Sequence, residues 1–308
     1  MMTENLTSWR SISLRTKIWE APTISIPYLW EPPMKKLWRI INQAPKTRTI
    51  NLCIYGSTDC GKTTWANESL LSLNEYLNLG QFGIIKITCQ TNATLKGLYE
   101  QILDELQWPY TKSDNIQRLE KSLRPAFKER SSLLLVIDEF SQLQNMYKDQ
   151  QVYEVLKALR NIPQWTRRPI LLIGTPLILD LLEKDNDTNN RFIKFEFPRF
   201  QLKDGKWKHL QKVIKTLSGY SFNTIGVKVK DSTISSGNIL ELLFTRSKGK
   251  IGALIKIYER SVEVALDSSS QIITDTHFHE AIQELDRDRL LFDSNPVDIE
   301  VPEQWWNE

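Results

Sequence analysis

The chain has 308 residues, of which 41% are hydrophobic and 25% are charged. This balance is typical of a globular protein and excludes a disordered or fibrous chain. The length allows about two domains, and no apolar run approaches the roughly 20 residues needed to cross a bilayer. We therefore expect a cytoplasmic protein with no membrane partner.

The charge is unevenly distributed along the sequence. The formal net charge is +3, but residues 284–308 contain eight acidic residues and two arginines, a balance of −6 that leaves +9 on the rest. Such a surplus is compatible with a nucleic acid or another polyanion as partner. The three cysteines are too few for a disulfide framework and fit a reducing compartment.

Residues 1–35 contain several tryptophans and prolines but no sustained helical or alternating period. We predict that they form an extended N-terminal arm. The arm either packs on its own domain or holds a neighbouring subunit or another protein, because aromatic side chains favour such anchors.

Residues 36–200 alternate between apolar runs of strand length and amphipathic segments of helix length. The predicted strands are 50–55, 82–89, 133–137, 169–173 and 193–197. The predicted helices are 34–42, 63–79, 94–106, 116–128 and 152–159. Unbroken apolar strands alternating with helices indicate an α/β fold with a central parallel five-stranded sheet covered on both faces.

After Pro198 the strand pattern stops, and helical patterns continue to residue 290. The predicted helices are 207–217, 239–244, 251–266 and 277–285. We expect a smaller helical domain at 201–290, with the apolar stripe of helix 251–266 in its core. Residues 291–308 form an acidic tail with two adjacent tryptophans.

The clearest chemical motif lies between the first strand and the helix that follows it. Residues 56–63 read GSTDCGKT and fit G-x-x-x-x-G-K-[ST] in its required strand–loop–helix context. In such a loop, backbone amides point at phosphate oxygens, Lys62 reaches the β- and γ-phosphates, and the Thr63 hydroxyl is a ligand of Mg²⁺. We expect ATP and Mg²⁺ as cofactors. The predicted nucleotide-binding residues are Gly56, Ser57, Thr58, Asp59, Cys60, Gly61, Lys62, Thr63 and Thr64.

Two acidic residues follow the most apolar strand, 133–137. Asp138 is placed to serve the Mg²⁺ shell together with Thr63, and Glu139 is placed to polarise the attacking water as general base. The alternative is that both are exposed acids that open a loop. Next to a phosphate-binding loop, we interpret them as catalytic and metal-binding residues.

Two further polar residues lie at the ends of later strands. Thr175 follows the strand 169–173 and could orient the hydrolytic water, although Gly-Thr-Pro is also a good turn sequence. Arg191 precedes the last strand and could reach the γ-phosphate of a neighbouring subunit as an arginine finger, or be an ordinary surface arginine.

The motifs GSTDCGKT, LLLVIDE, LLIGTP and RFIKFEFPRF together resemble the TniB/TnsC group, AAA+ regulators of DNA transposition that also serve CRISPR-associated transposons. The resemblance extends to TLKGLYEQILDEL and to SKGKIGALIKIYERSVEVAL, and covers roughly residues 34–290. It implies a P-loop AAA+ ATPase with a helical lid domain and Mg²⁺-dependent hydrolysis. It assigns the sensor-1 role to Thr175 and the role of a finger in trans to Arg191.

The resemblance also implies partners. The ATPase would form a homo-oligomer, a ring or a helical filament, on double-stranded target DNA. It would link a TniQ-like target selector to the transposase, with hydrolysis controlling disassembly. Lys96, Thr111 and Lys112 would contact DNA phosphates without reading sequence, although Lys96 could equally lie on a solvated helix face. Ala253 stands where the group often has the sensor-2 arginine.

Two alternatives keep the fold and change the function. The first is a STAND-type or replication-loader-like ATPase that acts on protein partners without forming a DNA filament. The second is a scaffold in which bound ATP is scarcely hydrolysed and serves only as a structural switch.

Overall fold

The computed structural model describes residues 27–43, 49–90, 94–145, 149–199 and 207–287. These residues form two compact units that divide after Phe200, and each unit is described by itself. Residues 1–26 of the predicted arm and the whole acidic tail lie outside the described residues.

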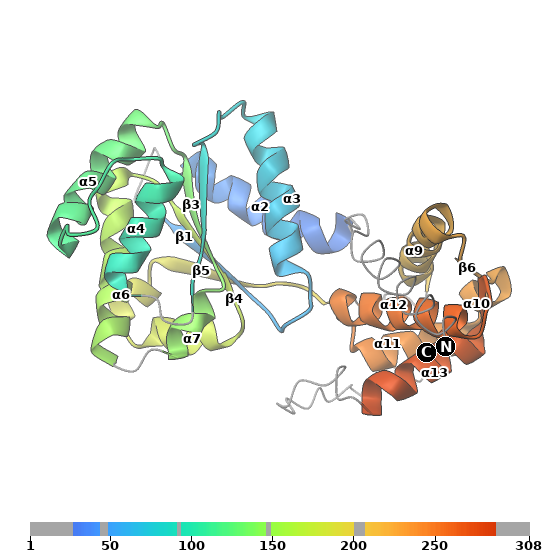
Figure 1. The fold of residues 1–308 in the computed structure, drawn as a ribbon. Helices are drawn as coiled ribbons and strands as arrows, with labels where there is room; N and C mark the ends of the chain where they lie inside the picture. Colours follow the sequence, from blue (N-terminus) through green and yellow to red (C-terminus); the bar gives the residue numbers. More distant parts are fainter. Residues whose placement is uncertain (1–26, 44–48, 91–93, 146–148, 200–206, 288–308) are drawn as a thin grey trace, which may run out of the picture. The chain divides into compact units, whose positions relative to one another are not determined.

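The first unit is built on a five-stranded parallel sheet (Figure 1). Its strands follow the order β2-β3-β4-β1-β5. They are β1 (Asn51–Tyr55), β2 (Ile84–Thr88), β3 (Leu134–Asp138), β4 (Ile170–Gly174) and β5 (Phe192–Glu196). The predicted parallel five-stranded sheet is confirmed. The register sets Thr88 opposite Asp138 and Tyr55 opposite Gly174, so the loops after β1, β3 and β4 emerge at the same edge of the sheet.

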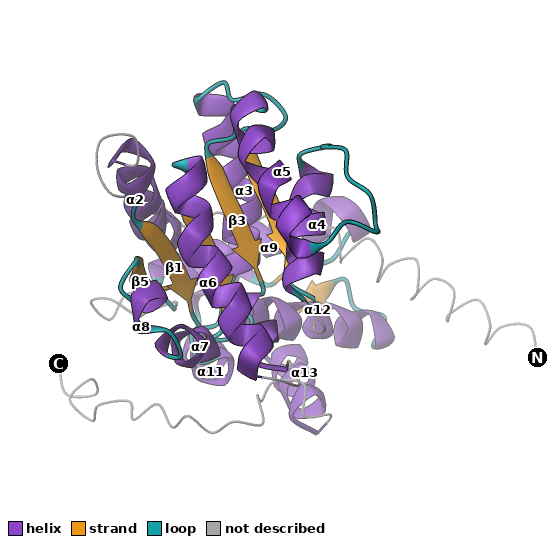
Figure 2. Cartoon of the chain, turned by 90° about the vertical axis from the view of Figure 1, so that its left-hand side faces the viewer, coloured by secondary structure: helices purple, strands orange, loops and turns teal. Residues whose placement is uncertain are grey.

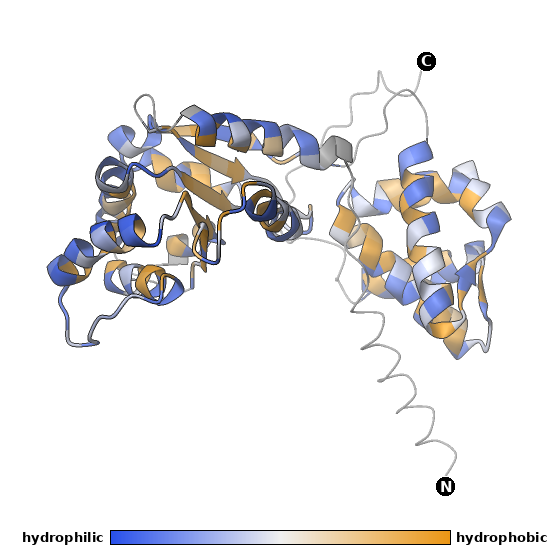
Figure 3. Cartoon of the chain, turned by 90° about the horizontal axis from the view of Figure 1, so that it is seen from above, coloured by the Kyte–Doolittle hydropathy of each residue, from blue (hydrophilic) through white to orange (hydrophobic). Residues whose placement is uncertain are grey.

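Helices cover both faces of this sheet because its central strands β3, β4 and β1 present buried apolar side chains on both sides. Leu135 and Ile137 of β3 pack toward one set of helices, and Leu134 and Val136 toward the other. The first set is α4 (Leu95–Glu105), α5 (Ile116–Glu129) and α6 (Asp149–Thr166). Figure 2 views the sheet from the side of these helices. The second set contains α3 (Lys62–Tyr76). Figure 3 shows the strands as a hydrophobic layer between these helices.

The second set also contains α2 (Pro27–Gln43), which contradicts part of the predicted arm. Residues 27–35 are helical, not extended, so the expected domain boundary at residue 35 falls inside a helix. Two prolines each remove a backbone hydrogen bond from this helix. Burial of Leu37, Ile40 and Ile41 against the sheet offsets that loss, and the Trp65 Nε1 donates to the Trp30 carbonyl at 3.2 Å.

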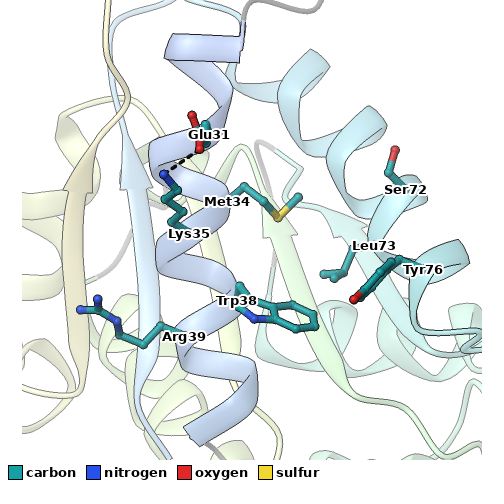
Figure 4. Close-up of a pocket in the computed structure, with 8 residues that line it drawn as sticks. All are labelled: Glu31, Met34, Lys35, Trp38, Arg39, Ser72, Leu73 and Tyr76. Atoms are coloured by element: carbon teal, nitrogen blue, oxygen red, sulfur yellow. Dashed lines mark ion pairs between the residues drawn. The ribbon is translucent and has the colours of Figure 1, made fainter.

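An open groove of about 750 Å³ lies between α2 and α3 (Figure 4). The exposed rings of Trp38 and Tyr76 meet edge to face across it, with centroids 5.8 Å apart. On the α2 side, Lys35 forms an ion pair with Glu31 at 2.6 Å. The groove lies beside the C-terminal half of α3, whereas the phosphate-loop motif ends in the first turn of this helix.

Three short elements of the first unit do not appear in the sequence pattern. They are the 3-10 helix η1 (Phe140–Asn145) and the helices α7 (Leu177–Glu183) and α8 (Asn186–Asn189). Each is too short to show a helical period. The helix predicted at 152–159 is also longer than expected, because α6 spans eighteen residues.

The second unit is mainly helical. Its helices are α9 (Lys208–Ile225), α10 (Asp231–Ser235), α11 (Gly237–Ser247), α12 (Ile251–Asp267) and α13 (Asp275–Arg287). Leu254, Tyr258 and Val262 of α12 are buried, as its apolar stripe predicts. The prediction that strands stop after Pro198 is wrong, since β6 (Lys228–Val229) and β7 (Ile272–Ile273) form a two-stranded parallel sheet. Two-residue strands are too short to alternate visibly.

No helix in the described ranges combines the length and the apolar character needed to cross a membrane.

Candidate nucleotide-binding site

The phosphate-loop motif connects β1 to α3 at the C-terminal edge of the sheet. Its conformation requires glycine at two places. Gly61 has φ 91°, in the left-handed region. A Cβ on Gly56 would lie 3.2 Å from the Cys60 Sγ and 3.3 Å from the Phe197 Cβ. The loop therefore depends on glycine for its turn and for its close packing.

The first turn of α3 presents backbone amides without a side-chain cap. Gly61 is the N-cap residue and offers no side-chain hydrogen bond. Thr63 and Thr64 are exposed in this turn. An uncapped helix N-terminus after a glycine-rich loop combines free N–H donors with the positive end of the helix dipole, and so it favours an anion such as a phosphate.

Lys62 is folded back onto the loop. Its Nζ donates to the carbonyl oxygens of Gly56 and Ser57, each at 2.8 Å, and lies 3.6 Å from the Cys60 Sγ. Burial raises the pKa of the Cys60 thiol, which the nearby ammonium offsets only in part, so Cys60 stays a neutral thiol. Neutral carbonyls are weaker partners for an ammonium than phosphate oxygens. The loop therefore holds Lys62 in place, and its ammonium can still exchange these carbonyl oxygens for phosphate oxygens.

Two buried hydroxyls at this edge have no hydrogen-bond partner in the described part of the chain. They are the Oγ of Ser57 and the Oγ1 of Thr175. The loop and Thr175 are neighbours, because the Gly56 N–H donates to the Gly174 carbonyl at 3.2 Å. An unsatisfied buried hydroxyl costs about 1–3 kcal/mol. Two of them at the same edge fit a site that is completed by a polar ligand.

Ser141 of η1 fixes the end of β4. Its Oγ accepts a hydrogen bond from the Thr175 N–H at 3.1 Å. A Cβ on Gly174 would lie 3.1 Å from that oxygen and 3.2 Å from the Ser141 backbone nitrogen, so the approach requires glycine. The sequence pattern does not indicate Ser141, because only the folded course of η1 brings it to Thr175.

Asp138 and Glu139 form the acidic part of the site. Asp138 ends β3 and is 2% exposed. Its Oδ1 accepts from the Glu139 N–H at 2.9 Å, and its Oδ2 lies 3.1 Å from the Nζ of Lys86. Glu139 has φ 54°, a left-handed conformation that is strained for a residue with a side chain and is typical of functional positions. Lys86 was not among the predicted site residues, although a lysine within the apolar segment 84–88 is a visible signal.

A family model described as the bacterial TniB protein matches residues 31–202, more than half of the chain. The chain belongs to the TniB family. No curated protein sequence matches it. The match to the family model confirms the resemblance stated for the motifs of residues 56–63 and 133–139.

Solved structures show the fold of this TniB-family protein. The ORC2 protein of Aeropyrum pernix in its ADPNP-ADP complexes has a TM-score of 0.61 at 16% identity, over 86% of this chain and 69% of that one. The Aeropyrum pernix ORC1 protein in complex with DNA has 0.61 at 17%, over 87% and 68%. The RuvB branch migration motor of Thermotoga maritima has 0.50 at 19%, over 86% and 72%. The TniB-family protein is thus an AAA+ ATPase, as predicted.

Arg191 lies at the opposite edge of the sheet from the phosphate loop. Its carbonyl accepts from the N–H of Asn51, the first residue of β1, at 2.9 Å. Its guanidinium donates to the Arg160 carbonyl at 3.5 Å. The structure therefore does not bring Arg191 to the site of its own TniB-family chain, and its role in trans stays a prediction.

The three predicted DNA-binding residues lie together at the N-terminal ends of α4 and α5. The Nζ of Lys96 donates to the Lys112 carbonyl at 2.6 Å, and the Thr111 N–H donates to Asp114 at 2.8 Å. An exposed basic row also runs along α5; it was not predicted, although its spacing of three or four residues is visible in the sequence. The α5 row consists of Arg118, Lys121, Arg124 and Lys128.

Ala253, at the expected sensor-2 position, is buried in α12. Its methyl group offers no charge to a nucleotide.

Proposed function

We propose that this TniB-family ATPase binds Mg·ATP at the interface between neighbouring copies and assembles on double-stranded DNA. There it links a TniQ-like target selector, of the kind that CRISPR-associated transposons use, to a transposase, and hydrolysis controls disassembly. The observation that carries the proposal is that the predicted site residues of one chain lie at two opposite edges of its sheet. Lys62, Asp138, Glu139 and Thr175 belong to one edge of the sheet, and Arg191 belongs to the other.

The residues at the phosphate-loop edge supply binding and the activation of water. The Nζ of Lys62 would leave the loop carbonyls for the phosphates, and the α3 amides would donate to them. Thr63 and Asp138 offer the hard oxygen ligands that Mg²⁺ prefers, and the ion would offset charge on the phosphate oxygens. Glu139 would accept a proton from the attacking water, which the Thr175 hydroxyl would orient.

Arg191 would complete this site in a neighbouring copy. A guanidinium is always charged and stabilises the charge that develops on transferring phosphoryl oxygens. A copy whose Arg191 is held at its own opposite edge cannot supply this charge to itself. Oligomerisation would therefore be a condition of fast hydrolysis.

Mixing two slow variants would test whether the site is shared between neighbouring copies. Glu139→Gln and Arg191→Ala should each hydrolyse ATP about 100-fold more slowly than the unmodified protein. In an equal mixture, about a quarter of the interfaces join an intact Glu139 to an intact Arg191 and should recover activity. The measurement is phosphate release with duplex DNA present.

Each variant should still bind a fluorescent ATP analogue, which controls for folding. A mixture no more active than its components would show that Arg191 does not act in trans.

The cations at the ends of α4 and along the α5 row support contact with the DNA backbone. The row residues Lys121 and Arg124 are exposed on one face of α5. Two of the similar solved structures, the Aeropyrum pernix ORC1 protein and the Drosophila ORC, are bound to DNA. Contacts to phosphates alone give binding that tolerates any sequence and weakens as salt rises.

Charge reversal tests this surface. With ATP and random-sequence duplex at low salt, Lys121→Glu should weaken DNA binding at least about tenfold and lower the dependence of affinity on salt. The matched control is Lys157→Glu, an exposed lysine on α6, which should bind as the unmodified protein does. Fluorescence anisotropy of a labelled duplex gives both quantities. Absence of ATP-stimulated binding in the unmodified protein would favour the alternative, an ATPase that acts on protein partners.

A further inference from the structure

A lysine on β2 reaches the carboxylate of Asp138. The Nζ of Lys86 lies 3.1 Å from Oδ2 of Asp138, whose side chain is almost completely buried. The same nitrogen donates to Oδ1 of Asn67 on α3. Lys86 thus joins β2, β3 and the helix that follows the phosphate loop.

The sheet register places this ion pair. Lys86 stands opposite Val136, and Asp138 lies two residues further along β3, so both side chains project from the same face of adjacent strands. The position of Lys86 beside Asp138 therefore does not depend on a loop conformation. Lys86 is part of the rigid frame that carries the predicted metal ligand.

Both oxygens of Asp138 therefore have partners before any metal binds. Oδ1 accepts from the Glu139 N–H, and Oδ2 faces Lys86. A buried carboxylate needs such compensation, because an unpaired buried charge is strongly destabilising. A divalent cation on the same carboxylate, however, would be repelled by the ammonium at short range.

We propose that Lys86 is a positioning residue that holds Asp138 before metal binding and competes with Mg²⁺ for its carboxylate. This inference rests on the proposed function, in which Asp138 serves the Mg²⁺ shell. Asn67 gives the ammonium a second partner on the exposed side, so Lys86 keeps a hydrogen bond when it leaves Asp138. The balance between the two partners sets the Mg²⁺ concentration that nucleotide binding requires.

Three variants in the full chain test the competition. Lys86→Met keeps the apolar stem and removes the charge, so half-saturation should need about tenfold less Mg²⁺. Lys86→Arg keeps a cation beside Asp138 and should stay closer to the unmodified protein. Asn67→Ala removes the second partner and should raise the Mg²⁺ requirement roughly two- to threefold. The matched control is Lys194→Met, a lysine on β5, which should change nothing.

The readout is Mg²⁺ titration of the binding of a fluorescent, non-hydrolysable ATP analogue, with no DNA present. A second readout is thermal unfolding in excess chelator, where Lys86→Met should unfold at a lower temperature because Asp138 loses its compensating charge. Added metal and analogue should remove most of that difference.

An unchanged or higher Mg²⁺ requirement in Lys86→Met would overturn the competition. If Lys86→Met does not fold, Asn67→Ala decides, because Asn67 is exposed and an unchanged requirement there would equally overturn it. The titration needs neither hydrolysis nor DNA. Normal competition without ATP-dependent assembly on DNA would therefore contradict the proposed function alone, and assembly without competition would contradict this inference alone.

Discussion

The two parts of the candidate site each hold a lysine, and they hold it differently. In the phosphate loop, Lys62 rests on two neutral backbone carbonyls at 2.8 Å. In the acidic part, Lys86 of β2 forms an ion pair with the buried carboxylate of Asp138 at the end of β3. An ammonium is attracted more strongly to a carboxylate, which carries a full negative charge, than to neutral carbonyl oxygens. On the proposed function, the phosphate loop would bind its ligand without breaking an ion pair, whereas Mg²⁺ at the acidic part would first have to displace Lys86 from Asp138.

Backbone strain is also divided unequally between them. The phosphate loop takes a left-handed conformation at Gly61, where it is free of steric cost, and at Asp59, whose short polar side chain tolerates it. The acidic part takes it at Glu139, whose side chain is the candidate general base. Strain at a residue that performs chemistry persists only where the surrounding structure fixes it. The acidic part therefore depends more on its supporting residues than the phosphate loop does.

Among substitutions that should affect the two parts of the site differently, Gly174→Ala should have the largest effect. The new Cβ would meet the Ser141 backbone nitrogen at 3.2 Å and its Oγ at 3.1 Å, and it would push η1 away from β4. We expect a loss of about 1–3 kcal/mol in the free energy of unfolding. Hydrolysis should fall more than nucleotide binding, since Thr175 moves and the phosphate loop stays. Urea denaturation and analogue binding measure the two effects.

The matched control is Gly219→Ala. Nothing lies within 4 Å of the added Cβ, and the position is inside α9, where alanine should stabilise by up to about 1 kcal/mol. If Gly174→Ala weakened nucleotide binding as much as hydrolysis, the two parts of the site would not be separable as we describe them.

The sequence predicted what depends on local pattern. Five strand-length segments rich in apolar residues predicted the five strands, and the motif at residues 56–63 predicted the loop between β1 and α3. Asp138 was predicted because it directly follows an apolar run. These signals are contained in a few adjacent residues, so no knowledge of the packing is needed to read them.

What the sequence did not predict depends on contacts between distant residues. Lys86 meets Asp138 only through the pairing of β2 with β3, and Ser141 meets Thr175 only through the course of η1. The prolines of α2 read as a break in helical structure, because the burial that offsets them is tertiary. The roles of Glu139 and Arg191 remain predictions, since they concern water and a second copy.

The smallest effect should come from Glu259, a half-buried carboxylate whose nearby lysine offsets its burial less than Lys86 does at Asp138. Burial, and then the neighbouring Glu263, raise the pKa of Glu259 on α12 from 4.5 to about 7, which Lys256 offsets only in part. The native state therefore binds the proton more tightly than the unfolded chain does. The resulting stabilisation is complete below pH 4.5 and is lost as the pH rises through 7. Glu259→Gln keeps a neutral side chain, so it should be more stable than the unmodified protein at pH 8 by about 1 kcal/mol after allowance for solvent screening.

Urea denaturation at pH 5 and pH 8 tests this expectation, because the variant should gain stability relative to the unmodified protein only at the higher pH. Glu280→Gln changes an exposed glutamate on α13 and should show no such pH dependence. An equal difference at both pH values would mean that packing, and not charge, distinguishes the variant. A pH-dependent difference would show what a half-buried carboxylate costs this protein when a nearby lysine offsets its burial only in part, whereas Asp138 has Lys86 in direct contact.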